Sequence, residues 1–201
     1  MEHNNKYLLP LLTLLVVFIS GATSENLNIT SPLITNWGVW GYFEKCPDGL
    51  AVQGFQLKTQ RFIGILGDDT AVNGLNLFCG DPRNQSTTVI SSNSGSKGEY
   101  GSIYSCFPGY INGFQLRVET NQGNGDDTAT NNIRVYCSNE PDPTRYVEGD
   151  GLNFGIWSEA RWCFSTQRIC GIQTQVEDCS GTDDCTSLNN ILTECCDIEL
   201  P

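Results

Sequence analysis

Apolar and polar residues alternate in several short segments of the chain, which is the pattern of half-buried β-strands. From Gly54 onward, Phe55 and Leu57 alternate with Gln56 and Lys58. The same alternation recurs later in the chain, with apolar residues set among polar ones: Ile111, Phe114, Leu116 and Val118 beside Gln115, Arg117 and Glu119. These segments are therefore predicted to be strands with one buried face.

A second alternating segment closes each of these units. Its apolar residues share one face: Leu75, Leu77 and Cys79 in the first unit, and Ile133, Val135 and Cys137 in the next. Between the two segments lies a turn rich in Gly, Asp and Asn, residues that readily adopt positive φ or bond to the nearby backbone. After the N-terminal leader, no stretch keeps a helical period for three turns. The sequence therefore predicts an all-β fold.

Three copies of this unit follow one another at a fixed spacing, over about residues 37–79, 97–137 and 154–196. The cysteines that close the copies are each 58 residues apart: Cys79, Cys137 and Cys195. A fixed period indicates a repeat architecture, in which one unit cannot bury its apolar face alone. We expect each unit to supply a sheet, and the three sheets to share one core about a common axis in a single domain, residues 25–201.

Each copy also carries a glycine at the start of its first strand, where a bulge or a close backbone approach is expected. These glycines are Gly54, Gly113 and Gly171.

The first 24 residues resemble a secretory signal peptide. Lys6 supplies a positive charge, an apolar run extends from Leu8 to Ile19, and Ala22-Thr23-Ser24 forms a small-residue cleavage site. A membrane anchor is the alternative, but the run of about 12 residues is shorter than the roughly 20 that a spanning helix needs. We therefore expect an exported protein, with glycosylation sequons at Asn28 and Asn84.

Ten cysteines, all after residue 45, predict a disulfide framework in an exported chain. Pairing within each repeat respects the symmetry: Cys46–Cys79, Cys106–Cys137 and Cys163–Cys195. The four remaining cysteines lie in the third repeat, where Cys179–Cys185 and Cys170–Cys196 are the expected pairs. An exchange of Cys195 and Cys196 between Cys163 and Cys170 is an open alternative, because adjacent strand residues face opposite ways.

Composition limits the chemistry. Removal of residues 1–24 removes the only histidine, so a Ser-His-Asp triad or a His-ligated zinc site cannot form. The net charge of −12 disfavours nucleic acids and anionic membranes as partners. Basic proteins and neutral glycans remain as partners, and no cofactor or metal is expected.

Each copy has an aspartate pair in its turn: Asp68 and Asp69, Asp126 and Asp127, Asp183 and Asp184. Two carboxylates could act on a glycosidic bond or bind calcium. A motif repeated three times is better explained by turn geometry, in which an aspartate accepts backbone N–H bonds. Three asparagines that follow the pairs are expected to belong to the same turns: Asn73, Asn131 and Asn189.

The aromatic residues also allow two interpretations, packing within the protein or contact with sugars. Trp40, Tyr100 and Trp157 are equivalent in the three copies, and we expect them to pack in the core or on a sheet rather than to stack on sugars. Trp37 and Trp162 have no tryptophan counterpart in the other copies. They are the better candidates for a specific glycan contact, together with Asp126 and Asn131.

The tripled pattern of aromatic residue, Cys, Gly-Phe-Gln-Leu, Gly-Asp-Asp-Thr-Ala, Asn and Cys resembles the vitelline membrane outer layer protein family. The resemblance extends from about Trp37 to Cys196 and rests on Cys46-Pro47-Asp48-Gly49, Gly54-Phe55-Gln56-Leu57 and Gly125-Asp126-Asp127-Thr128-Ala129. It implies a β-prism of three antiparallel Greek-key sheets with pseudo-three-fold symmetry. It also implies a secreted protein of extracellular coats, with a lectin-like architecture and a link to chitin-type oligosaccharides.

The third copy departs from the family pattern around Thr182-Asp183-Asp184 and adds Cys179 and Cys185. A site built from that turn is therefore not expected. The function expected from the sequence is that of a secreted, non-catalytic structural or glycan-associated protein. The alternative is a carbohydrate-active enzyme that transfers or hydrolyses N-acetylated oligosaccharides through carboxylates.

Overall fold

The computed structural model describes residues 26–61, 69–81, 83–120, 128–140, 142, 144–179 and 185–198. Every regular element in these ranges is a β-strand, so the all-β prediction is confirmed. The strands are β1 (Leu27–Thr30), β2 (Val39–Trp40), β3 (Glu44–Lys45), β4 (Ala51–Thr59), β5 (Val72–Asp81), β6 (Asn84–Ser91), β7 (Glu99–Ser105), β8 (Ile111–Val118), β9 (Thr130–Cys137), β10 (Val147–Glu148), β11 (Ile156–Trp157), β12 (Arg161–Trp162), β13 (Gln167–Val176) and β14 (Leu188–Asp197). In the same residues no helix has the length and apolar character needed to cross a membrane.

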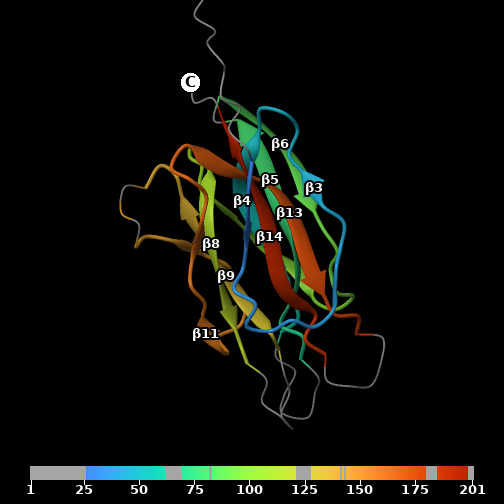
Figure 1. Cartoon of the computed structure of the whole chain (residues 1–201). Coiled ribbons are helices and arrows are strands. Elements are labelled where there is room, and N and C mark those ends of the chain that lie inside the picture. The colour runs from blue at the N-terminus through green and yellow to red at the C-terminus, as the bar shows by residue number, and fades with distance from the viewer. Residues whose placement is uncertain are drawn as a thin grey trace, which may run out of the picture.

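The strands form three antiparallel sheets that pack around one core (Figure 1). Sheet A has the order β1-β14-β13-β2, with β3 also paired to β13. Sheet B has the order β6-β5-β4-β7, and sheet C has the order β10-β9-β8-β11, with β12 also paired to β8. The centre of each sheet is the strand pair predicted from one repeat, and the three sheets make the predicted β-prism.

Each sheet takes one edge from the next repeat along the chain. Strand β7 of the second repeat pairs with β4, and β11 and β12 of the third repeat pair with β8. Strands β2 and β3 of the first repeat pair with β13 of the last one, which closes the ring. The expectation that each repeat forms its own sheet is therefore wrong for the edge strands, because a repeat contributes to two sheets.

The disulfides expected within the repeats consequently link neighbouring sheets. Cys46 donates its backbone N–H to Cys170 of β13 at 2.7 Å, while its sulfur is bonded to Cys79 of β5. The same arrangement holds for Cys106–Cys137, between sheets B and C, and for Cys163–Cys195, between sheets C and A. Three covalent links thus close a ring of three sheets.

The two other disulfides are local. Cys170–Cys196 joins β13 to β14 within sheet A, and Cys179–Cys185 closes a loop with a sequence separation of 6. The structure therefore has the pairing favoured from the sequence and not the exchange of Cys195 with Cys196. No cysteine is free.

The core consists of the inward residues of the central strand pairs. Phe55, Leu57, Leu116 and Ile172 have no exposed surface, and each stabilises the fold by about 1.5 to 3 kcal/mol relative to an exposed position. The strand register shifts at each repeated glycine, as expected for a bulge: Val52/Gly54, Ile111/Gly113 and Ile169/Gly171. The bulge sets the alternation so that Phe55 and its counterparts face the axis.

The glutamine of the repeated Gly-Phe-Gln-Leu motif holds the incoming edge segment. Gln56 donates its side-chain amide to the carbonyl of Gly101 at 2.9 Å, and Gln173 donates to that of Gly41 at 2.7 Å. Gln115 makes the equivalent bond to the carbonyl of Ser158. Each acceptor lies one residue after an aromatic edge residue, so this glutamine anchors the strand exchange between repeats.

A glycine with positive φ precedes each of these edge segments: Gly38, Gly98 and Gly155. Gly98 has a φ of 81°, and a Cβ there would lie 2.5 Å from the backbone nitrogen of Gln60. Only glycine combines this backbone conformation with such a close approach.

Candidate functional site

The aspartate pairs fall mostly outside the described residues. Five of the six aspartates lie outside the described residues: Asp68, Asp126, Asp127, Asp183 and Asp184. Asp69 is described and has no exposed surface. Its carboxyl group is therefore enclosed at the base of its turn and does not face an open cleft.

The residues that follow the pairs form one polar network in three copies. Asn73 donates its side-chain amide to the hydroxyl of Thr70 at 2.6 Å and to the carbonyl of Ala71 at 3.1 Å. Asn131 and Asn189 repeat both bonds, with distances of 2.7 and 3.2 Å in each case. The central residue of each turn base adopts positive φ: Ala71, Ala129 and Ser187. The expectation that these asparagines belong to the turns is confirmed.

The threonine of each network also donates to a side chain at the end of the preceding strand. Thr70 bonds to the carbonyl oxygen of Gln60, and Thr128 and Thr186 bond to the carboxylates of Glu119 and Glu177, each at 2.6 Å. Two of these acceptors are carboxylates that are already engaged in holding a turn. The network is thus a structural device that fixes the base of each loop.

The three turn bases touch one another about the axis. Ser187 donates to the side-chain oxygen of Asn73 at 3.0 Å, and Thr130 donates to the backbone carbonyl of Asn189 at 3.1 Å. The side-chain oxygen of Asn131 is buried and has no hydrogen-bond partner among the described residues, because Ala71 occupies the position equivalent to Ser187. The prediction that Asn131 contacts a glycan is therefore wrong: its side chain is fully buried.

Trp37 and Trp162 are both partly exposed, at 36% and 40%, but they lie on different sheets. Trp37 precedes β2 of sheet A, and its backbone N–H donates to Asn189 at 3.1 Å. Trp162 ends β12 of sheet C and is paired with Gly113, near the opposite end of the strands. The structure therefore does not bring these two candidate residues into one site.

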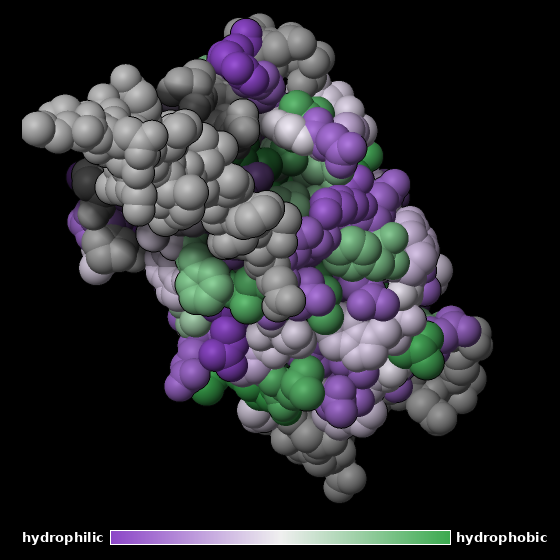
Figure 2. Space-filling model, turned by 45° about the horizontal axis from the view of Figure 1, so that its top comes forward, coloured by the Kyte–Doolittle hydropathy of each residue, from purple (hydrophilic) through white to green (hydrophobic). Residues whose placement is uncertain are grey.

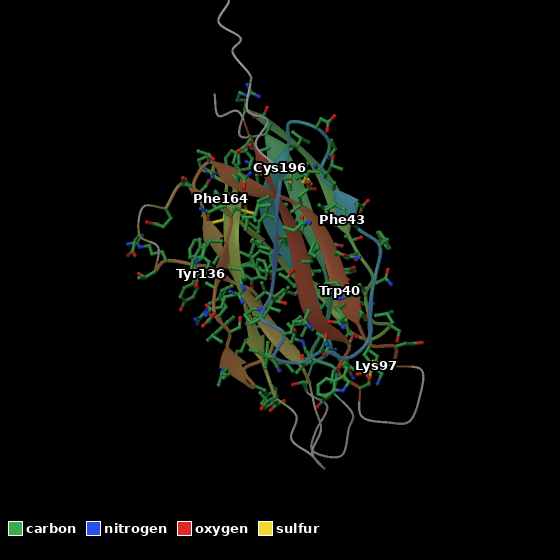
Figure 3. All side chains as sticks on the ribbon, viewed as in Figure 1. Trp40, Phe43, Lys97, Tyr136, Phe164 and Cys196 are labelled. Carbon is green, nitrogen blue, oxygen red and sulfur yellow. A yellow bond between two sulfur atoms is a disulfide. The ribbon has the colours of Figure 1, made fainter. Side chains whose placement is uncertain are left out.

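The three equivalent aromatic residues are not in the core. Trp40 and Tyr100 are exposed on the outer surface, and Trp157 is half-buried there. Figure 3 shows Trp40 and Phe43 together beside β13, away from Tyr136 on the other side of the molecule. The core alternative is wrong because these residues lie on the exchanged edge strands. The alternative of packing on a sheet holds for Trp157, whose ring lies 3.9 Å from the guanidinium of Arg134 in β9.

The outer face of sheet C carries a continuous layer of aromatic and arginine side chains. The guanidinium of Arg134 lies 3.9 Å from the ring centroids of both Tyr146 and Trp157, and its Nε donates to Glu148 at 2.8 Å. Tyr136 packs against Trp162 with a centroid distance of 4.3 Å. Cation–π contacts of this kind contribute about 0.5 to 2 kcal/mol each, so they stabilise this arrangement of side chains.

Trp162 is a ring of this layer that is both exposed and firmly supported. A Cβ at Gly113 would lie 2.7 Å from its six-membered ring, so the indole rests directly on the backbone of β8. Tyr136 holds it from the side and donates its hydroxyl to Gln115 at 3.0 Å. Burial raises the pKa of the Tyr136 phenol, so the neutral hydroxyl that donates this hydrogen bond is favoured further over the charged form.

The coloured part of the face shown in Figure 2 has no single large apolar patch. Hydrophobic residues there form separate areas among hydrophilic ones. Aromatic stacking on such a surface is therefore local, at individual supported rings.

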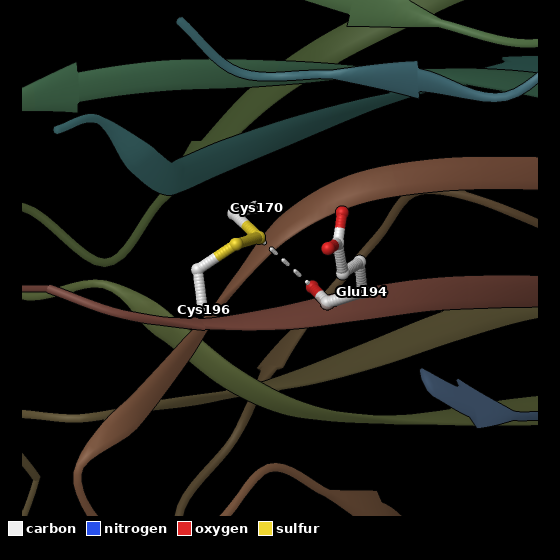
Figure 4. Close-up of side chains that lie close together, drawn as sticks. All are labelled: Cys170, Glu194 and Cys196. Carbon is white, nitrogen blue, oxygen red and sulfur yellow. Dashed lines mark hydrogen bonds between the residues drawn. A yellow bond between two sulfur atoms is a disulfide. The ribbon is translucent and has the colours of Figure 1, made fainter. Parts of the chain in front are cut away.

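One group of side chains has the spacing of metal ligands but not their chemistry. Cys170, Glu194 and Cys196 bring their ligand atoms within 4.8 Å of one another (Figure 4). The two sulfurs form a disulfide, and metal binding needs thiolates. The carboxylate of Glu194 is paired with Lys45 at 3.1 Å, so these residues do not form a metal site.

The two sequons differ in what the structure describes. Asn28 is exposed on β1, at the edge of sheet A, where a glycan would extend into solvent. Asn84 begins β6, but its side chain lies outside the described part of the chain.

The described residues thus form an all-β prism whose three sheets are joined by disulfides. The chain belongs to the vitelline membrane outer layer protein I family, which it matches over residues 27–198. It is 41% identical over 164 residues to vitelline membrane outer layer protein 1 homolog of Mus musculus, covering 80% of this chain and 78% of the relative. The homolog of Homo sapiens is 40% identical over 165 residues, with the same coverage.

Solved structures with a similar fold include a lectin and a complex with mannotriose. A prostate-specific WGA16 glycoprotein lectin has a TM-score of 0.52 and 10% identity, covering 85% of this chain and 99% of that chain. Artocarpin in complex with mannotriose has a TM-score of 0.51 and 9% identity, covering 86% and 99%. At these identities the likeness shows the fold alone. Family membership and the disulfides point to an extracellular protein.

Proposed function

We propose that this chain is a secreted, non-catalytic protein of an extracellular coat or matrix that associates with glycans. The observation that carries the proposal is Trp162, whose ring rests on Gly113 and remains 40% exposed. A supported aromatic ring with an open face offers a flat apolar surface to a pyranose ring. The fold already holds the Trp162 ring in place, so less conformational entropy is lost when a sugar binds.

The non-catalytic part of the proposal rests on the carboxylates. A retaining glycosidase needs two carboxyl groups about 5 to 5.5 Å apart, and an inverting one roughly 6.5 to 9.5 Å, across a cleft that admits a sugar. Asp69, the candidate carboxylate among the described residues, is fully buried. Glu177 is occupied by the backbone N–H and the hydroxyl of Thr186.

Secretion is supported by the leader-like residues 1–24 and by the five disulfides, which persist in oxidising compartments. The net charge of −12 makes basic coat proteins the natural protein partners. Attraction of that kind weakens as salt shortens the Debye length to about 8 Å at physiological ionic strength. Binding to such partners that is the same at low and high salt would argue against a role for the acidic charge.

A glycan array with purified protein tests the proposal, together with a turnover assay on chitin oligomers. We expect binding without turnover, and a loss of binding in Trp162→Ala. Trp40→Ala is the matched control, since Trp40 is 37% exposed on a different sheet. Turnover of chitin oligomers by the wild type would favour the enzymatic alternative, and an absence of binding to every glycan would contradict the association with glycans.

A further inference from the structure

A groove of about 550 Å³ opens beside the aromatic layer of sheet C, at the end of the prism that holds the Cys106–Cys137 disulfide. Its aromatic walls are Phe107 and Tyr146, which are 51% and 45% exposed. Its polar lining includes Asn139, Glu140 and Arg145. Small-molecule sites commonly have volumes of about 300 to 1,000 Å³ and combine such walls with a few polar groups.

The loop that forms one side of the groove is held by its own hydrogen bonds. Ser138 and Tyr110 exchange two bonds, at 2.8 and 3.0 Å. Glu140 accepts from the backbone N–H of Asp142 at 3.2 Å and from Arg145 at 3.4 Å. Asp142 in turn accepts from the backbone and hydroxyl of Thr144 at 2.9 and 2.6 Å. The polar groups of the groove are therefore positioned before any ligand arrives.

The loop that borders the groove is longer than its counterpart in the first repeat. Nine residues separate β9 from β10 in the second repeat, whereas β6 follows β5 almost directly in the first. Extra length that only one of these two repeats has is not needed to close the prism. This is the property that we expect of a specific binding site.

The charges of this surface cancel in pairs. Arg145 is paired with Glu140 in the groove, and Arg134 is paired with Glu148 on the adjoining face, with 2.8 Å between the Arg134 and Glu148 atoms. Arg117, 5.8 Å from the Trp157 ring, bonds to the carbonyl of Gly155 and to Asn153. Asp142 of the groove loop adds a negative charge, and the chain as a whole is at −12. Anionic ligands are disfavoured on both counts, while paired charges still donate and accept hydrogen bonds with hydroxyl groups.

We propose that the groove between Phe107 and Tyr146 binds a neutral oligosaccharide, whose chain continues over Tyr146 onto the aromatic face that ends at Trp162. The sugar rings stack on the exposed aromatic side chains, and Asn139, Glu140 and Arg145 bond to the hydroxyl groups. This inference rests on the proposed association with glycans and names the ligand class and the surface for it.

The test uses the full mature protein and two probes, cellohexaose as a neutral chain and a heparin hexasaccharide as an anionic one, measured by calorimetry. We expect binding to cellohexaose and weaker or no binding to heparin. Phe107→Ala should weaken the affinity for cellohexaose by about tenfold, which corresponds to about 1.4 kcal/mol. Tyr146→Ala should do the same, and its thermal stability is checked because Tyr146 also stacks on Arg134.

Phe164→Ala is the matched control. Phe164 follows Cys163 as Phe107 follows Cys106, it is 64% exposed, and it does not line the groove. Its substitution should leave the affinity unchanged. Equal losses in Phe164→Ala and Phe107→Ala, or none in either groove variant, would overturn the assignment of the groove. The association with glycans would then stand if Trp162→Ala still abolished binding.

Preferential binding of heparin would overturn the neutral ligand class. A wild-type protein that binds neither probe would also overturn this inference. The glycan array then decides separately whether the broader association with glycans holds.

Discussion

Ser187 donates a hydrogen bond to the side-chain oxygen of Asn73 across the axis of the prism, with 3.0 Å between the two oxygen atoms. Both side chains are fully buried, and they come from the third and the first repeat. Gly95 lies against this pair, since a Cβ there would be 2.0 Å from the Ser187 hydroxyl oxygen and 2.4 Å from the Asn73 oxygen. The contact therefore couples distant parts of the chain at the base of the turns.

Ser187→Ala should lower the free energy of unfolding by about 1 to 3 kcal/mol, because the buried oxygen of Asn73 loses its donor. Urea denaturation measures the change, and exposed Ser96→Ala is the control, for which a change within about 0.5 kcal/mol is expected. An equal effect of both substitutions would show that this hydrogen bond is unimportant for stability.

Gly95→Ala should also destabilise the fold, since its methyl group would overlap two buried oxygen atoms. In the Ser187→Ala background the penalty should be smaller, because one of these atoms is gone. A double-mutant cycle measures the coupling between the two positions. Strict additivity would contradict the packing described for Gly95.

Gly98→Ala and Gly49→Ala form a second matched pair. Both glycines have positive φ, 81° and 78°, but only at Gly98 would a Cβ meet the backbone of β4, while nothing lies within 4 Å of the one at Gly49. Gly49→Ala should cost about 1 kcal/mol of unfolding free energy for the conformation alone. Gly98→Ala should cost clearly more, and melting temperatures would settle the comparison.

The disulfides should differ in their contribution according to the loop that each one closes. Replacing Cys106 and Cys137 with serine opens a link with a sequence separation of 31, which by chain-entropy reasoning contributes about 3.7 kcal/mol. Replacing Cys179 and Cys185 opens a separation of 6, for which about 2.4 kcal/mol is expected. The first pair also joins two sheets, so its loss should lower the melting temperature more. The reverse order would contradict the sheet-linking role.

The groove loop should respond to acid through Asp142. Hydrogen bonds from Thr144 hold the pKa of the Asp142 carboxyl below its usual value, so the folded loop favours the charged form. The resulting stabilisation is present above a pH of about 3.9, the unperturbed value, and is lost as the pH falls through the lowered pKa. NMR titration of the carboxyl carbon should show a higher pKa in Thr144→Val. An unchanged pKa would show that the Thr144 hydroxyl does not shape this loop.

Most of the architecture follows from residue patterns. The period of 58 residues identifies equivalent positions, and the alternation after Gly54 and its counterparts identifies the strands that face the core. The cysteine pairs of the first two repeats also follow from the symmetry, whereas in the third repeat the exchange of Cys195 and Cys196 is left open by the sequence. These features are local in sequence or repeat at a fixed distance, so they can be recognised in one amino-acid sequence.

The exchange of edge strands does not follow from those patterns. Spacing shows that Trp40, Tyr100 and Trp157 are equivalent, but it does not show which repeat each one pairs with. Strands β2 and β11 have two residues each and are too short to display an alternation, so the outward orientation of Trp40 and Trp157 has no sequence signal. The burial of Asn131 was missed for a related reason, because an asparagine near a turn suggests a solvated surface.

Because the ring of sheets is closed, any of the three repeats could come first along the chain. Strand β1 pairs with β14, so the first and last described segments lie side by side, and every repeat meets its two neighbours in the same way. A gene rearranged to begin between two repeats, with the present ends joined by a linker, would encode the same contacts and the same five disulfides. A gene with one repeat fewer would leave an unpaired sheet edge, so the ring permits rotation of the sequence but not shortening.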